Sequence, residues 1–333
     1  MKDYSRANPS TSDFERAARA ALQLFGLRDA TFELAGFVEN VVYKVTSAGS
    51  SFVLRLHRPG YHTLAELEAE QAWTAALNEA GLAAPQPVST CTGERYVLVD
   101  VPGSSPRYAG LSVWRPGQTM DALINHEVNP ILVARRFAEL GGLAAAVHNQ
   151  AVNWEPPTSF ERHALDADGL VGENPWWGRF WEARGLSANE RARLKDLRDS
   201  LHACLLGYSQ SNRTYSLIHS DLHPGNVLLH KGRLSIIDFD DAGYGWHAYE
   251  LAVALYRYLD EPLLNGYRDA LLEGYADRRQ LPPDCMAQMS VFWIARTLQT
   301  IGWINDRPEL GKDSNVPALA ERAHRLAGKI GLA

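Results

Sequence analysis

The 333-residue sequence predicts an α+β fold of two unequal lobes: a small N-terminal lobe built on an antiparallel sheet and a larger, mostly helical C-terminal lobe. Two observations predict this division. Strand-like runs of apolar and β-branched residues are concentrated between residues 31 and 114. Helical periodicity dominates from about residue 130 onwards, interrupted by one short β segment at residues 217–238. We therefore expect lobes of residues 1–116 and 117–333.

The N-terminal lobe is expected to begin with a helix and to continue with three strands. Ser12 and Glu15 match a capping box, apolar residues then recur at helical spacing as far as Phe25, and Gly26 supplies a stop. A Gly-Ser turn predicts a hairpin between the second and third strands. The three strand-like runs cover residues 31–35, 41–46 and 52–56.

A second helix and two more strands complete this lobe. Thr63 and Glu66 form another capping box, and the helix that they open is expected to end at Gly81. Strand-like runs follow at residues 96–99 and 111–114. The turn-forming residues after the last strand lead into the helical lobe.

Composition and charge exclude several classes of protein. Lys and Arg total 33 and Asp and Glu total 39, so the net charge of −6 disfavours partners such as nucleic acid or anionic lipid. The longest apolar run, residues 251–256, is far too short to span a membrane. The N-terminus lacks the apolar core of a signal peptide, and the three cysteines form no disulfide framework. We therefore expect a cytoplasmic protein.

The most informative stretch of the chain is the polar segment at residues 217–240. It contains the pattern His219-x-Asp221-x-x-x-x-Asn226, followed twelve residues later by an Asp-Phe-Asp run that begins at Asp238. Alternating apolar residues between Asn226 and Asp238 predict a short hairpin. Because Asn226 precedes the hairpin and Asp238 follows it, we expect these two side chains to lie close together.

The residue types in this segment suit phosphoryl transfer. That reaction depends on positioning and on Mg²⁺, which prefers a few hard oxygen ligands together with phosphates and water. Asn226 and Asp238 supply such oxygens, and Asp221 is left to orient an attacking hydroxyl group and accept its proton. Pro224 and Gly225 predict a tight turn between the base and the metal ligand.

The same motif and spacing resemble the aminoglycoside phosphotransferase and choline kinase family, which has the protein-kinase-like fold. The resemblance implies that Asp221 is the catalytic base, that Asn226 and Asp238 bind Mg²⁺, and that His219 fixes the loop. It further implies ATP and Mg²⁺ as cofactors. The acceptor is expected to be a hydroxyl group of a small molecule, such as an aminoglycoside or an amino alcohol.

Two other interpretations of this segment remain open. His219, Asp221 and His223 offer mixed ligands for Zn²⁺, Fe or Mn, as in metallophosphoesterases. Those sites need a further His/Asp cluster, and the sequence contains no Gly-Asn-His-Asp run. The segment could also be a turn-rich loop whose Asp and Asn side chains only satisfy backbone groups.

The N-terminal lobe offers candidates for binding the nucleotide. The segment around Gly36 and Asn40 occupies the position of a kinase glycine-rich loop, although it has one glycine and also fits an ordinary hairpin turn. Residues 111–117 resemble the hinge between the lobes, where backbone groups of Ser112 and Trp114 would meet the adenine. An edge strand followed by a turn is the alternative.

A cation and an acidic partner are expected beside the phosphates. Arg55 stands on the third strand where kinases usually have lysine, and a guanidinium group can hold phosphate oxygens. Its expected partner is a glutamate on the following helix. Glu70 and Glu66 share the face that carries Trp73. We favour Glu70, because the capping box already accounts for Glu66.

The acceptor side is less defined. Clustered tryptophans, which more often pack in a core, and a helix-like run at residues 293–306 are both candidates for substrate contact. An acidic rim after Asp238 would favour a cationic acceptor, although capping or solvated carboxylates are the favoured explanation. His148 is expected to be structural. The candidate residues are Trp176, Trp177, Trp181, Arg296, Trp303 and Asp306, with Asp240, Asp241 and Glu250 for the rim.

The sequence therefore favours an ATP-dependent small-molecule kinase. A bacterial protein Ser/Thr kinase of the same fold and a non-catalytic nucleotide-binding module are the alternatives. The intact set of Asp221, Asn226 and Asp238 argues against the last of these. The identity of the acceptor and the oligomeric state are left open.

Overall fold

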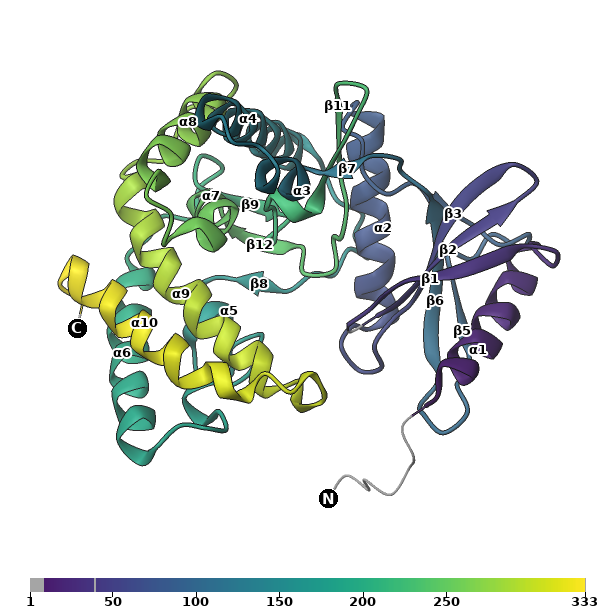
Figure 1. Ribbon diagram of the computed structural model, residues 1–333, viewed down its shortest axis with the longest axis horizontal. Coiled ribbons are helices and arrows are strands. Elements are labelled where there is room, and N and C mark those ends of the chain that lie inside the picture. The colour runs from purple at the N-terminus through teal and green to yellow at the C-terminus, as the bar shows by residue number, and fades with distance from the viewer. Residues whose placement is uncertain (1–8, 39, 333) are drawn as a thin grey trace. The chain divides into compact units, whose positions relative to one another are not determined.

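The computed structural model describes residues 9–38 and 40–332 (Figure 1). The chain has a mixed α+β fold and divides into two compact units. Residues 1–117 form most of the first unit, but two later segments, 155–161 and 230–237, also belong to it. The second unit contains residues 118–154, 162–229 and 238–333.

An antiparallel sheet forms the centre of the first unit (Figure 1). Its strands are hydrogen-bonded in the order β1 (Thr31–Phe37), β2 (Val41–Ser47), β3 (Ser50–Leu56), β6 (Arg107–Val113) and β4 (Pro87–Val88), and β5 (Tyr96–Val99) also pairs with β6. The three strands expected between residues 31 and 56 are confirmed. The strand expected at 111–114 begins earlier, at Arg107, and ends at Val113.

Helix α1 (Thr11–Leu24) packs its apolar side chains on one face of this sheet, where Phe14 and Leu22 join a cluster with Val45 and Leu54. The capping box expected at Ser12 and Glu15 is wrong. The box is formed two residues earlier, since the carboxylate of Asp13 accepts from the backbone N–H of Ser10 at 2.7 Å. Ser10 has extended backbone angles, which an N-cap requires, whereas Ser12 already lies in the first turn.

Helix α2 (Leu64–Glu79) covers the opposite face of the sheet (Figure 1). Its predicted capping box is confirmed, with reciprocal contacts between Thr63 and Glu66. Side chains alternate along β3, so Leu54 and Leu56 point into the cluster below α1 and Arg55 points to the other face. This alternation carries Arg55 towards α2.

Helices make up most of the second unit: α3 (Met120–Asn125), α4 (Pro130–Asn153), α5 (Ala167–Val171), α6 (Ala188–Leu206), α7 (His247–Leu255), α8 (Leu264–Ala276), α9 (Cys285–Asn305) and α10 (Val316–Ile330). Helices α4 and α8 lie side by side at close range, because Gly141 and Gly274 present no side chain at the contact. A Cβ atom at Gly141 would lie 1.9 Å from the carbonyl oxygen of Leu271. No helix within residues 9–38 and 40–332 is long and apolar enough to cross a membrane.

Short strands of the second unit hold the polar loop of residues 219–226 at both ends. Strand β9 (Tyr215–Ile218) leads into the loop and pairs antiparallel with β12 (Gly243–Trp246), which is parallel to β8 (Ala164–Leu165). Strand β10 (Val227–His230) leads out and pairs with β7 (Gln118–Thr119), while β11 (Arg233–Ile236) belongs to the first unit. Since Ile218 lies opposite Gly243, the loop starts beside the segment that follows Asp238.

Candidate functional site

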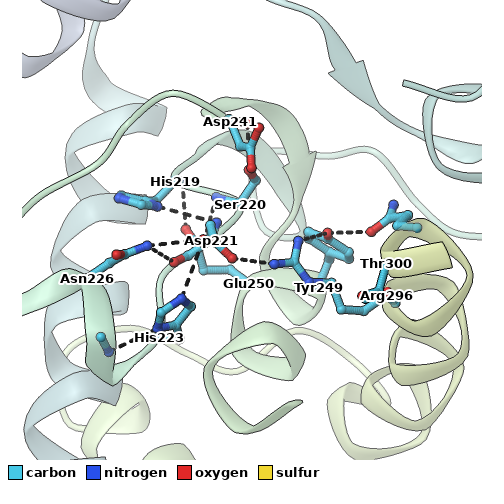
Figure 2. Close-up of polar contacts among 12 residues, drawn as sticks. His219, Ser220, Asp221, His223, Asn226, Asp241, Tyr249, Glu250, Arg296 and Thr300 are labelled. Atoms are coloured by element: carbon cyan, nitrogen blue, oxygen red, sulfur yellow. Dashed lines mark hydrogen bonds and ion pairs between the residues drawn. The ribbon is translucent and has the colours of Figure 1, made fainter. Parts of the chain in front are cut away.

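The loop between β9 and β10 brings Asp221 and Asn226 together (Figure 2). The side-chain nitrogen of Asn226 donates to the backbone oxygen of Asp221 at 3.0 Å and to its carboxylate Oδ2 at 3.1 Å. A 3₁₀ turn at Pro224–Asn226 closes the loop, as the Pro-Gly pair predicts. The turn therefore fixes both the backbone and the side chain of Asp221.

Glu250 on α7 binds the backbone at the start of this loop. Its Oε2 accepts from the backbone N–H of His219 and its Oε1 from that of Ser220, each at 2.8 Å. Leu222 contributes a third backbone N–H. Burial raises the pKa of the Glu250 carboxyl group, against the lowering effect of these donors. A fully buried carboxylate thus holds the loop in one conformation.

Buried histidines support Glu250. The ring of His148 places Nε2 3.5 Å from Glu250 Oε2, and a hydrogen bond of 2.9 Å joins its Nδ1 to the hydroxyl of Tyr275. His148 also stacks on His247 at a ring-centroid distance of 4.1 Å. Burial lowers the pKa of His148 to about 3, so the ring is neutral near pH 7. The expected structural role of His148 fits these contacts.

The carboxylate of Asp221 has charged and polar donors on both oxygens. Arg296 of α9 donates to Oδ1 in an ion pair, and His223 Nε2 lies 3.4 Å from Oδ2, the oxygen that also accepts from Asn226. Burial by itself would raise the pKa of Asp221, but Arg296, His223 and His219 together hold it well below its ordinary value. Asp221 is therefore ionised at neutral pH.

Asp238 follows β11 in a left-handed backbone conformation, with φ of +66°. Aspartate is one of the few residues with a side chain that adopts this conformation readily. The next residue, Phe239, is fully buried, and its ring centroid lies 4.5 Å from that of His219. The hydroxyl of Ser220 donates to the backbone oxygen of Asp241 at 2.5 Å. The segment containing Asp238 thus packs against the loop that carries Asp221.

His219 is buried, and its side chain stabilises the loop by contacts with the Asp221 backbone and the Phe239 ring. Its Nδ1 accepts from the backbone N–H of Asp221 at 3.3 Å, while its ring packs on Phe239. The alternative of a Zn²⁺, Fe or Mn site at His219, Asp221 and His223 finds no support in this geometry. Among the residues that the structure describes, no group of three or more His, Cys, Asp or Glu side chains is arranged to hold a metal ion.

In the first unit the predicted pair of charges is present. Arg55 Nη1 lies 3.9 Å from Glu70 Oε1, and both side chains are largely buried. Glu66 instead accepts from the backbone N–H of Thr63 at 2.8 Å and serves the helix start. The structure therefore pairs Arg55 with Glu70, the glutamate that we favoured.

The other nucleotide-binding candidates lie in or beside the same sheet. Gly36 lies in β1 opposite Val42, and Asn40 Oδ1 accepts from the backbone N–H of Arg58 at 2.9 Å. Glu39, within the predicted loop, falls outside the described residues.

The hinge candidates are engaged in the sheet. Ser112 pairs with Val53 on one side and Pro87 on the other. The N–H of Trp114 donates to the Ser51 carbonyl at 3.0 Å. The backbone N–H of Trp114, one of the groups near the predicted hinge, is thus already used within the sheet.

The structure decides against two of the interpretations offered for the acceptor side. Glu250 and Asp240 are buried and Asp241 is half-buried, so these carboxylates form no exposed acidic rim. Trp177 and Trp181 are buried too. Large flat side chains in this segment fill the core of the unit, which is the more common role of clustered tryptophans.

Arg296, a lesser candidate in the sequence, lies at the centre of the site. Its guanidinium pairs with Asp221, as described above, and lies 3.4 Å from the Tyr249 hydroxyl oxygen. Sequence reasoning did not connect these residues, and it did not place His223 or Tyr249 in the surroundings of Asp221.

Comparison with known proteins identifies the family. A model of the phosphotransferase enzyme family matches residues 33–284, more than half of the chain. The chain belongs to this family. The resemblance to aminoglycoside phosphotransferases and choline kinases is therefore confirmed, and the phosphotransferase has their protein-kinase-like fold.

Relatives of this phosphotransferase include kinases of small molecules. A microcompartment-associated aminopropanol kinase of known structure is 29% identical, with a TM-score of 0.81 over 96% of this chain and 99% of that one. An amicoumacin kinase solved with AMP-PNP and Ca²⁺ is 18% identical, with a TM-score of 0.76 over 96% and 94%. The amicoumacin kinase of Bacillus subtilis (strain 168) is 22% identical over 89% of this chain and 86% of its own length.

Proposed function

We propose that this phosphotransferase moves the γ-phosphoryl group of ATP to a hydroxyl group of a small molecule. The observation that carries the proposal is the ionised Asp221 carboxylate, held between Arg296, His223 and Asn226 on a loop that Glu250 anchors. The likeness to an aminopropanol kinase along nearly the whole chain supports a small acceptor, and an amino alcohol is the first to test.

Asp221 would act on the acceptor rather than on the nucleotide. Its carboxylate accepts a hydrogen bond from the acceptor hydroxyl and aims the oxygen at the γ-phosphorus. As the new O–P bond forms and the bond to ADP breaks, the hydroxyl proton passes to the carboxylate. Because its pKa is depressed, Asp221 contributes mainly by orienting the hydroxyl and accepts the proton late in the reaction.

Asn226 and Asp238 fit the requirements of Mg²⁺. The side-chain nitrogen of Asn226 is occupied by Asp221, so its side-chain oxygen is the atom that can bind a cation. Asp238 adds a carboxylate, and one amide oxygen and one carboxylate together with phosphates make a usual Mg²⁺ ligand set. When bound, the ion would neutralise charge on the phosphate groups.

We assign nucleotide binding to the first unit, the lobe predicted at residues 1–116, and acceptor binding to the second. Arg55, held by Glu70, would contact phosphate oxygens. The loop at Gly36 and Asn40 would cover the phosphates.

Replacing Arg55 with methionine is expected to raise the KM for ATP by about tenfold or more, because a charged hydrogen bond contributes about 1.5–3 kcal/mol. The KM for the acceptor should stay within about twofold. Steady-state kinetics with each substrate varied in turn measures both constants. Arg28→Met, at an exposed position before β1, is the control. An unchanged KM for ATP would remove Arg55 from the nucleotide site.

The function itself is tested by a panel of acceptors. We would measure release of ADP and formation of phosphorylated product with 1-amino-2-propanol, choline, an aminoglycoside, homoserine and a protein substrate. We expect turnover with at least one small molecule and none with the protein. Turnover with the protein alone would establish a protein kinase instead. ATP binding without turnover on any acceptor would favour a non-catalytic nucleotide-binding module.

A further inference from the structure

Arg296 is the only charged residue in the sequence of α9, residues 285–305. Its neighbours Ala295 and Thr297 are buried, and Arg296 itself is only 18% exposed in its side chain. Placing a cation in such surroundings costs free energy unless it is paired. The pairing with Asp221 offsets this cost, and the remaining contacts show that the guanidinium is held in one place.

The guanidinium contacts the loop that carries Asp221 and helix α7 (Figure 2), and an aromatic ring lies nearby. Nη2 donates to Asp221, and Nη1 lies 3.4 Å from the hydroxyl oxygen of Tyr249 on α7. Tyr249 in turn donates to Oε1 of Gln299 at 2.7 Å, so its oxygen faces Arg296 as an acceptor. The centroid of the Trp177 ring lies 6.0 Å from the guanidinium carbon. Arg296 therefore has contacts in the second unit besides the one with Asp221.

The two oxygens of Asp221 have different sources of support. Oδ2 contacts Asn226 and His223, which belong to the same loop, whereas the Oδ1 contact comes from Arg296, 75 residues further along the chain. The last torsion of an aspartate side chain has a broad energy profile. Contacts on one oxygen therefore leave the carboxylate plane poorly defined, and a donor on the second oxygen defines it.

We propose that Arg296 is the positioning residue of Asp221: by holding Oδ1 from α9, it sets the carboxylate orientation that receives the acceptor hydroxyl. This inference rests on the proposed function. It makes the α9 helix part of the catalytic geometry. It also predicts that loss of the guanidinium affects the rate of transfer more than the binding of ATP.

The test compares kcat and KM in Arg296→Met, which keeps the length of the aliphatic stem and removes the donors. We expect kcat for acceptor phosphorylation to fall by about 10- to 100-fold, since a misplacement of about 1 Å can cost 100-fold. The KM for ATP should change less than about twofold. Arg296→Lys keeps the charge but not the planar fork, and should recover only part of the rate.

Chemical rescue separates positioning from simple support of the fold. Guanidinium or methylguanidinium ion added to folded Arg296→Ala should raise kcat severalfold and saturably, without affecting the wild-type enzyme. Arg322→Met on α10 is the matched control, because Arg322 also pairs with an aspartate, at 3.2 Å, lies over an aromatic ring and is 20% exposed. Its removal should leave kcat unchanged.

Different outcomes overturn different claims. If the wild-type enzyme phosphorylates an acceptor and Arg296→Met has the same kcat, the positioning role of Arg296 is overturned. The proposed function then still stands. A reduced kcat with no rescue in a folded Arg296→Ala protein would do the same. If Arg296→Met does not fold, the rate and rescue of Arg296→Gln decide by the same criteria. A wild-type protein inactive on every acceptor would overturn the proposed function and this inference with it.

Discussion

Replacing Asp221 with asparagine is expected to lower kcat for phosphorylation of the acceptor by about 10²–10⁴-fold, the usual contribution of a general base. Asparagine keeps the size of the side chain and one oxygen, so the contacts of the loop are largely preserved. It cannot take the proton, and its neutral amide no longer balances Arg296. Single-turnover transfer and ATP binding by calorimetry should show a slow enzyme that still binds the nucleotide.

The matched comparison is Asp238→Asn, because asparagine also tolerates the left-handed backbone at that position. Loss of even an outer-shell partner weakens metal binding by about 10–100-fold, so we expect at least that loss in the Mg²⁺ dependence of ATP binding. Asp221→Asn should leave this dependence unchanged. If Asp221→Asn and Asp238→Asn show the same Mg²⁺ dependence of ATP binding, or if Asp221→Asn keeps full activity, the separate roles of Asp221 and Asp238 are contradicted.

Replacing Glu250 with alanine should destabilise the second unit by about 3 kcal/mol or more, because each buried N–H left without an acceptor costs about 1–3 kcal/mol. The carboxylate accepts from His219 and Ser220 in a fully buried position. Urea unfolding should show the loss of stability, and activity should fall because the loop that carries Asp221 loses its anchor.

Two further variants make this prediction specific. Glu250→Gln retains one side-chain oxygen and should lose less stability than Glu250→Ala. Glu273→Ala, at an exposed position on α8, should change stability by less than about 0.5 kcal/mol. If Glu250→Ala unfolds at the same urea concentration as Glu273→Ala, the anchor role is wrong.

The sequence predicted the elements whose signals are local. The capping box depends on two residues in the same helical turn, Thr63 and Glu66. The strands between residues 31 and 56 depend on residues of neighbouring hairpins. The box at Ser12 was misplaced because two overlapping patterns fit the same helix start, and backbone geometry selected Ser10. A short sequence pattern predicts that a helix is present more reliably than it predicts the residue at which the helix begins or ends.

The residues that we propose for the site were also accessible from sequence, because one short motif holds Asp221 and Asn226 on a single loop and Asp238 one hairpin later. The surroundings of Asp221 were not. An acidic rim was one interpretation of the carboxylates after Asp238, yet Glu250 turns inwards and binds the loop backbone. Spacing shows which residues are near in sequence, but burial decides which of them meet solvent.

By itself, then, the sequence determined the α+β class, the family and the residues proposed for base and metal. Each of these follows from patterns among residues that are close together in the sequence. Only the tertiary structure decided how Asp221 is held. Its two principal supports, Glu250 beneath the loop and Arg296 on α9, come from helices 31 and 75 residues away from the positions that they contact. Such pairings depend on how helices pack against one another, and no local pattern of residues specifies that packing.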